Sequence, residues 1–221
     1  MTPQEVTGRA RSHVVDVPGL RCALHRDVVK AFFAMRAAAL AAGFELTPAS
    51  GYRDFDRQLA IWNGKYAGER PTYDDAGARL DLVALSPGAR IEAILRWSAL
   101  PGASRHHWGT DLDLYDRSAR AAPRLEPAEY AAGGPFAPLS DWLEKNAARF
   151  GFFRPYRGDL SGVQAEPWHY SFAPVAYGAL RVLDCRVLRA AITAAPLAGK
   201  EAVLVLLDDL YARYVARIDP F

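Results

Sequence analysis

The segment Asp111-Leu112-Asp113-Leu114-Tyr115 limits the possible fold more than any other, because its residues alternate strictly between aliphatic side chains and polar or aromatic ones. Successive side chains of a β-strand point to opposite faces, so a period of two predicts a strand. Leu112 and Leu114 are expected to face the core, and Asp111, Asp113 and Tyr115 the other side. The chain therefore has to place two carboxylates on one face of a sheet.

Helical spacing and turn residues predict the elements on either side of this strand. Asp27 and Ser140 are expected to cap helices, and Gly43 and Gly151 to end them. The predicted helices cover 27–42, 54–66, 91–100, 140–150 and 201–218, the short strands cover 44–46 and 166–172, and the long loops cover 67–81 and 121–138. Neither an internal repeat nor a domain linker interrupts this order.

The overall composition excludes several classes of protein. Lys and Arg number 27 against 25 Asp and Glu, so the net charge of +2 argues against a polybasic surface for nucleic acid. Cys22 and Cys185 are too few for a disulfide-dense scaffold or a four-cysteine zinc site, and the sequence does not decide whether they pair. The first residues carry no secretory signal, and the most apolar stretch, 202–207, is too short to cross a bilayer.

Two short clusters combine histidines with acidic residues: Ser104-x-His106-x-x-Gly109-x-x-x-Asp113 and Glu166-Pro167-Trp168-His169. Together they offer two imidazoles and one carboxylate as ligands, with a second carboxylate to spare. Catalytic zinc sites use three protein ligands and leave the fourth position to water, whereas structural sites use four protein ligands. These residue types therefore favour a catalytic site for one Zn²⁺ per chain.

The spacing within each cluster predicts its local geometry. Pro167 biases Glu166 toward extended backbone, and residues three apart on an ideal strand face opposite sides. A kink at Pro167 is therefore needed to bring Glu166 and His169 to one site. Gly109 is expected to let the chain fold His106 back toward Asp113.

The same motifs resemble a known family. Ser-x-His-(x)₆-Asp, followed some fifty residues later by Glu-x-x-His, is similar to the signature of the VanY-type D-alanyl-D-alanine carboxypeptidases. These are zinc peptidases of the group that also contains lysostaphin-like enzymes and the hedgehog signalling domain. Upstream, Ser50-Gly51-Tyr52-Arg53 with Gln58 resembles the substrate-binding segment of the family, and the match extends over about 44–172. The resemblance implies an α+β fold in which a small antiparallel sheet carries the zinc and helices flank it.

The resemblance also implies a role for each residue that matches. His106, Asp113 and His169 would be the zinc ligands and Glu166 the general base, which would take a proton from a zinc-bound water and pass it to the leaving amine. Arg53, whose planar guanidinium can donate two parallel hydrogen bonds, would hold the terminal carboxylate of the substrate.

Several further residues are assigned to the substrate side with alternatives left open. Ser104 would help to hold substrate or would cap the local backbone, Tyr52 and Gln58 would belong to the pocket or to its scaffold, and Trp168 is expected as a wall. His107 is expected to orient or pack, or to donate to the oxyanion. Asp111 departs from the family, in which this position is usually small; it would support the site from behind, alter substrate preference or compete with Asp113 as ligand.

The resulting hypothesis is a D-alanyl-D-alanine carboxypeptidase that acts on peptidoglycan stem peptides or muropeptides. An endopeptidase of the same family and a non-catalytic zinc or cell-wall binding module are the alternatives. The whole of 1–221 is predicted to be one peptidase domain, with a motif-bearing core over about 26–174 and a helical extension over about 175–221. The substrate favours an extracytoplasmic protein whose leader is absent from this chain over a cytoplasmic one, and the oligomeric state stays open.

Overall fold

The alternating segment forms β4 (Asp111–Asp116), an inner strand of a four-stranded antiparallel sheet. The computed structural model describes residues 1–75, 77–158 and 162–221. Asp113 lies opposite His169 in the pairing of β4 with β6, so the sheet itself places two site residues side by side. The strand order is β3–β4–β6–β5, in which β3 is Leu46–Ser50, β6 is His169–Phe172 and β5 is Phe152–Phe153.

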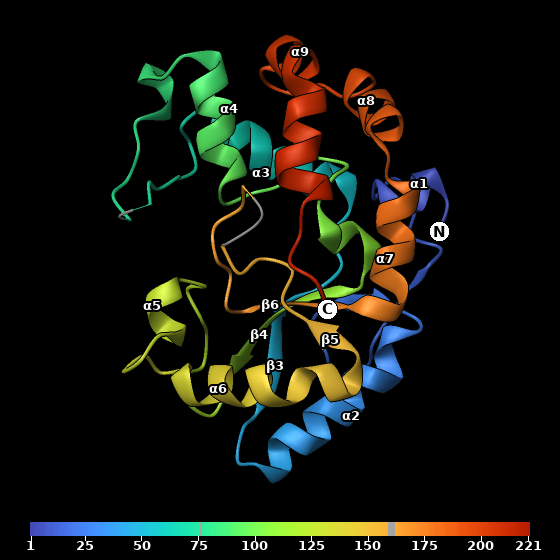
Figure 1. Ribbon diagram of the computed structural model, residues 1–221, viewed down its shortest axis with the longest axis vertical. Helices are drawn as coiled ribbons and strands as arrows, with labels where there is room; N and C mark the ends of the chain where they lie inside the picture. Colours follow the sequence, from blue (N-terminus) through green and yellow to red (C-terminus); the bar gives the residue numbers. More distant parts are fainter. Residues whose placement is uncertain (76, 159–161) are drawn as a thin grey trace.

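One face of this sheet packs on two helices, α2 (Val28–Ala41) and α6 (Ala137–Asn146). Leu112 and Leu114 belong to a buried cluster with residues of both helices, as the alternation predicts. In Figure 1, α2 and α6 lie together below the strands. Every residue of β4 is buried, so the opposite face, which carries Asp111 and Asp113, is covered as well.

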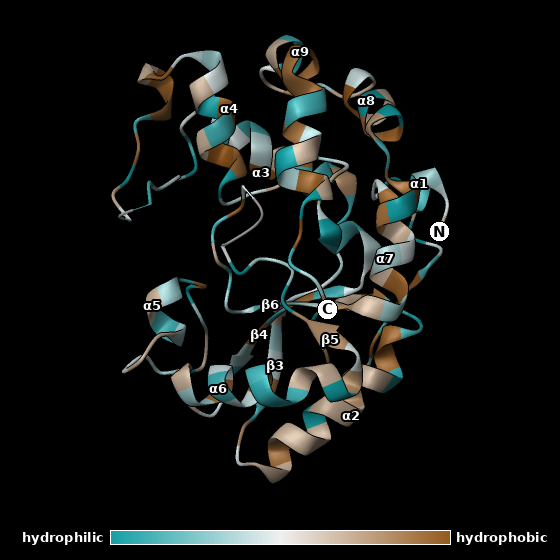
Figure 2. Cartoon of the chain, in the orientation of Figure 1, coloured by the Kyte–Doolittle hydropathy of each residue, from teal (hydrophilic) through white to brown (hydrophobic). Residues whose placement is uncertain are grey.

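The second face is covered by a helical layer with a core of its own. This layer comprises α3 (Phe55–Tyr66), α4 (Pro87–Leu95), α7 (Ala173–Val182), α8 (Cys185–Thr193) and α9 (Lys200–Tyr211). Their apolar residues meet in one buried cluster, which also takes in Trp108 and so anchors the short 3₁₀ turn Arg105–Trp108. Figure 2 shows brown apolar segments beside teal polar ones on α8 and α9, the colouring of helices with one buried face.

Short elements complete the chain. Strands β1 (Val14–Asp16) and β2 (Ala23–His25) form a separate antiparallel pair. The remaining elements are α1 (Pro3–Val6), α5 (Pro127–Tyr130), 3₁₀ turns at Leu82–Ala84 and Ala147–Phe150, and a π-helical turn at Ala212–Ala216 that extends α9. The architecture confirms the predicted α+β class with its small antiparallel sheet and flanking helices.

The helices expected over 27–42 and 54–66 are confirmed as α2 and α3, but others differ in their bounds. The helix expected over 91–100 is α4, which starts earlier because Ser86 caps it and Pro87 occupies its first position. Ser140 lies inside α6 instead of capping it, because Pro138 already occupies the first turn. The terminal helix expected over 201–218 is α-helical from Lys200 to Tyr211 and continues as the π-helical turn Ala212–Ala216.

The strands differ from the prediction in length. Of the strand expected over 44–46, only Leu46 belongs to β3, which runs through Pro48 to Ser50 with a register shift. Most of the predicted turn residues are therefore part of the sheet edge. The strand expected over 166–172 begins only at His169, because the chain turns at Pro167 and the His169 amide donates to the Glu166 carbonyl at 3.1 Å. The kink predicted at Pro167 is therefore confirmed.

Gly109 connects the turn that carries His106 to β4, and it offers a test of this arrangement. Its φ is +66°, and a Cβ at this position would lie 2.6 Å from the backbone nitrogen of His25. We expect Gly109→Ala to lower the free energy of unfolding by about 2–4 kcal/mol. The alanine would have to adopt an unfavourable left-handed backbone, and its Cβ would clash with the backbone of His25. Urea denaturation measures the change.

Gly133→Ala is the matched control. Its φ is +85°, but no atom lies within 4 Å of the added Cβ. We expect only the backbone term, about 1 kcal/mol. Equal losses for the two variants would show that close packing at Gly109 is unimportant.

Candidate metal centre and active site

Three side chains from separate elements meet above the sheet. His106 comes from the 3₁₀ turn, Asp113 from the middle of β4 and His169 from the start of β6, and one ligand atom of each lies within 4.8 Å of the others. Nε2 of His106 is 3.4 Å from Oδ2 of Asp113, and Nδ1 of His169 is 3.4 Å from Oδ1. The structure thus brings together the three residues predicted as metal ligands.

In each imidazole, the ring nitrogen that faces away from the site lies within hydrogen-bond distance of an oxygen atom, which fixes the ring. Nδ1 of His106 lies 2.8 Å from the carbonyl oxygen of Gly51, and Nε2 of His169 lies 2.9 Å from Oδ1 of Asp111. A ring nitrogen that donates to such an oxygen leaves the opposite nitrogen unprotonated and aimed at the site, as in many metal centres. His106 therefore presents Nε2, and His169 presents Nδ1, to the same point.

Asp111 supports the site from behind. It is fully buried, it contacts Nε of Arg105 at 2.8 Å, and it accepts from Thr110 at 2.5 Å. Burial acts to raise the pKa of Asp111, but the Arg105 charge and the bond to His169 hold the pKa below its usual range. Asp113 belongs to the group that could hold a metal ion, whereas Asp111 neither belongs to that group nor lines the cavity described below.

The chemistry of these residues fits a divalent cation. Oδ1 of Asp113 is buried without a hydrogen-bond partner in the described part of the chain, whereas Oδ2 accepts from Ser50 at 2.5 Å. Burial acts to raise the pKa of Asp113, yet the two histidines hold it well below its usual range. Burial likewise acts to lower the pKa of His169, but the neighbouring carboxylates of Asp111, Asp113 and Glu166 raise it well above normal. A cation at this position would give the buried Oδ1 of Asp113 the partner that it lacks.

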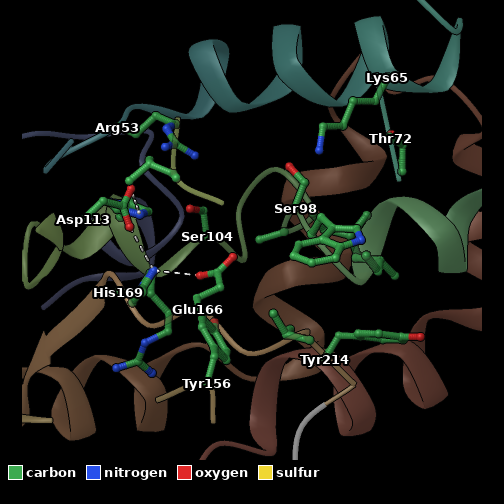
Figure 3. Close-up of a pocket in the computed structure, with 18 of the residues that line it drawn as sticks. Arg53, Lys65, Thr72, Ser98, Ser104, Asp113, Tyr156, Glu166, His169 and Tyr214 are labelled. Atoms are coloured by element: carbon green, nitrogen blue, oxygen red, sulfur yellow. Dashed lines mark ion pairs between the residues drawn. The ribbon is translucent and has the colours of Figure 1, made fainter. Parts of the chain in front are cut away.

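Glu166 lies beside this cluster without belonging to it. The turn at Pro167 points its side chain back, so that Oε2 is 3.1 Å from Nδ1 of His169. The carboxylate lines the cavity and remains 13% exposed (Figure 3). Glu166 is thus a carboxylate within reach of the site and of solvent, as a general base requires.

A cavity of about 290 Å³ opens from the metal-ligating residues. Its wall includes Arg53, Ser104 and Trp168 of the predicted substrate residues. Arg53 donates to Oε1 of Gln58 at 2.8 Å, and Gln58 in turn donates to the Ala99 carbonyl. Gln58 is fully buried and outside the cavity wall, so it holds Arg53 in place. The Ser104 side chain forms no capping bond to its own turn, which leaves its hydroxyl to the cavity.

Two other predicted residues lie away from the cavity. His107 is fully buried, with the Gly102 amide donating to Nε2 and the Arg53 carbonyl 2.6 Å from Nδ1. Burial lowers the pKa of His107 to about 3, so it is a neutral packing residue. Tyr52 borders a different surface hollow and meets the ring of His13 edge-on.

Several residues of the cavity were not predicted from the sequence. The Tyr156 ring meets the ring of His169 at 5.1 Å, and Lys65 extends into the cavity from α3 (Figure 3). Neither belongs to a motif, so the sequence did not indicate that they lie at the site. The far wall adds Thr72, Trp97, Ser98, Tyr214 and Val215, which lie far apart in the sequence.

No helix in the described ranges combines the length and apolar character that a bilayer crossing demands.

Comparisons with known proteins agree with the geometry. A curated D-alanyl-D-alanine carboxypeptidase of Enterococcus faecalis is 31% identical over 141 residues, which are 62% of this chain and 44% of that protein. The chain therefore spans less than half of this relative.

Two solved structures share the fold. VanYB in complex with D-alanine-D-alanine is 22% identical, has a TM-score of 0.55 and is aligned over 88% of this chain and 90% of its own. A mutant of the vancomycin-resistance D,D-pentapeptidase VanY in complex with Zn(II) is 24% identical, with a TM-score of 0.54 and coverage of 86% and 88%. At these identities the likeness establishes the fold.

The family model for VanY, described as D-alanyl-D-alanine carboxypeptidase, matches residues 21–175. The match contains both histidine clusters and the segment with Arg53, so it confirms the resemblance found in the motifs. The chain belongs to the VanY family of D-alanyl-D-alanine carboxypeptidases and is an enzyme of the metallopeptidase type that this family comprises.

Proposed function

We propose that this protein is a zinc-dependent carboxypeptidase that removes the terminal D-alanine from peptidoglycan stem peptides, with Glu166 as general base. The observation that carries the proposal is the grouping of two imidazoles and one carboxylate next to a further carboxylate, that of Glu166, in one cavity. The zinc complex of the structural neighbour and the family match support the choice of metal and substrate.

His106, Asp113 and His169 would hold the ion through Nε2, a carboxylate oxygen and Nδ1. Two nitrogens and one oxygen from the protein are one of the ligand sets found in catalytic zinc sites. When bound, zinc acts as a Lewis acid that acidifies water and polarises a carbonyl group. Asp111 and Gly51 fix the ring orientations on which this geometry depends.

Glu166 would accept the proton of the attacking water and deliver it to the amine of the departing residue. Its carboxylate faces the site, and its backbone amide donates to the Tyr156 carbonyl at 3.1 Å, which steadies the turn. Proton transfer by a positioned side chain contributes about 10²–10⁴-fold to a rate.

Arg53 and Ser104 would bind the free carboxylate of the C-terminal residue. Both line the cavity close to Asp113, and the bond to Gln58 leaves the rest of the guanidinium available to donate (Figure 3). An arginine matches a carboxylate through paired hydrogen bonds. A requirement for a free C-terminus separates a carboxypeptidase from an endopeptidase of the same family.

The chemistry of the substrate indicates where the protein acts, and the shared helical core indicates how many domains it has. Stem peptides of the cell wall lie outside the inner membrane, so we infer an extracytoplasmic site of action. We further propose that 1–221 acts as one peptidase domain, since α7, α8 and α9 share a core with α3 and α4, and Tyr214 and Val215 of the π-helical turn after α9 line the cavity.

Zinc binding is expected to stabilise the fold. At free zinc about 100-fold above Kd, the native state gains about 2.7 kcal/mol, which corresponds to a rise in Tm of about 5–10 °C for a protein of this size. His106→Ala and Asp113→Ala should abolish the rise, because each removes a ligand. Thermal scans of metal-free protein with and without zinc provide the measurement; an unchanged Tm in the wild type would contradict the metal site.

Glu166→Gln is expected to lower kcat by about 10³-fold and to keep the zinc-dependent rise in Tm, because the residue moves a proton and holds no metal. Release of D-alanine from a muropeptide pentapeptide, followed by mass spectrometry, measures the rate. The control is Glu201→Gln, an exposed glutamate in the first turn of α9. Full activity of Glu166→Gln would rule out the general base, and an inactive wild type with bound zinc would favour a binding module.

Arg53→Ala is expected to lower kcat/KM for peptides with a free C-terminal carboxylate by about 10- to 100-fold, the loss of one charge-assisted interaction. The same peptides with an amidated C-terminus should change little. The matched control is Arg186→Ala, whose side chain is 90% exposed on α8. If cleavage of the free-ended pentapeptide is unharmed by Arg53→Ala, the enzyme is an endopeptidase.

A further inference from the structure

The cavity extends well beyond the residues that the reaction needs. Its far end is bordered by Lys65, Thr72, Trp97, Ser98, Tyr214 and Val215. These come from the end of α3, the following loop, the segment after α4 and the π-helical turn after α9. Two of them, Tyr214 and Val215, lie beyond the stretch that matches the family model.

Hydrogen bonds and ion pairs hold this far wall in place. Nε1 of Trp97 donates to the carbonyl of Tyr73 at 2.9 Å. Arg213 bonds to Glu92 and to the hydroxyl of Tyr214 at 2.8 and 3.1 Å, which ties the π-helical turn to α4. A cavity end with two fixed aromatic side chains is a preformed surface for a ligand.

Lys65 is the charged residue of this far end. Its side chain is largely removed from water, and in the described part of the chain its ammonium forms neither a hydrogen bond nor an ion pair. Burial lowers the pKa of Lys65 to about 8, with Glu166 acting in the opposite direction and Arg53 and Arg70 in the same one. At neutral pH the group is therefore mostly protonated, a positive charge in a pocket without a bonded anion.

Figure 3 shows Lys65 reaching from α3 toward the space that Glu166 and Tyr214 also border. Arg53 precedes the same helix, at the end next to the metal ligands. The two cations thus lie near opposite ends of α3, whose 12 residues extend about 18 Å.

We infer that Lys65 binds a second carboxylate of the substrate, on the acyl side of the scissile bond, and so selects peptides that carry an acidic group upstream of the terminal pair. The inference rests on the proposed function, because it takes Arg53 to hold the terminal carboxylate. An extended peptide advances about 3.4 Å per residue, so after the reach of the lysine side chain the second carboxylate belongs about two to four residues before the C-terminus.

The alternative role for Lys65 is electrostatic. Its charge acts on Glu166, and a positive group near a general base changes the rate on every substrate alike. A carboxylate contact instead changes the ratio between substrates with and without that carboxylate. The two roles are separated by a pair of matched peptides.

The test uses two peptides that end in D-Ala-D-Ala and differ only three residues before the C-terminus, where one has a free glutamate carboxylate and the other its amide. With zinc-loaded wild type we expect kcat/KM to be about 10-fold higher for the carboxylate peptide, the effect of one charge-assisted hydrogen bond. Lys65→Met should bring this ratio close to one. Lys65→Arg, which keeps the charge, should retain a ratio above that of Lys65→Met.

Lys30→Met is the matched control, since Lys30 is exposed on α2 away from the cavity, and it should keep the wild-type ratio. Calorimetric binding of both peptides to zinc-loaded Glu166→Gln gives the same comparison without turnover. A wild-type ratio that persists in Lys65→Met, or an equal loss on both peptides, would overturn the inference. Preferential binding of the carboxylate peptide with no hydrolysis by the wild type would instead overturn the proposed function.

Discussion

Two buried carboxylates on one face of β4 determine which polar and charged groups the surrounding structure has to supply. A charge removed from water costs several kcal/mol unless a partner of opposite sign and hydrogen bonds compensate it. Asp111 meets this demand with Arg105 and Thr110. Asp113 meets it only in part, because one of its oxygens stays without a hydrogen-bond partner among the described residues. The His169 ring lies between the two carboxylates. The strand therefore positions the imidazole, and Asp113 keeps an oxygen with which it could bind a metal ion.

The two halves of the fold contribute different parts of the cavity. The sheet, packed on α2 and α6, supplies Asp113 and His169 of the three candidate metal ligands, and the 3₁₀ turn before β4 supplies His106. The helical layer supplies the far wall, including residues from the end of the chain. A rigid reactive end and a separately built far end allow substrate selection to change without disturbing the ligands.

Much of the site could be predicted because its residues lie in short motifs with local causes. Alternation placed Asp111 and Asp113 on one face, and Pro167 predicted the turn that returns Glu166 to His169. Helix bounds were less certain, since caps such as Ser86 act over a few residues and compete with packing. The loop after α3, the far wall and Lys65 carried no motif, so their approach to the site was not foreseen.

The sequence by itself determined the family, the ligand types and the face on which β4 presents its acids, because periodicity and short spacing act within a few residues of the chain. Only the tertiary structure decided that Asp113 faces the metal position whereas Asp111 lies behind His169, and that His107 is packed away from the cavity. It also decided that Lys65 and Tyr214 share a cavity with Glu166. These outcomes depend on burial and on contacts between distant segments, which balance charge across the whole core and leave no local mark on the sequence.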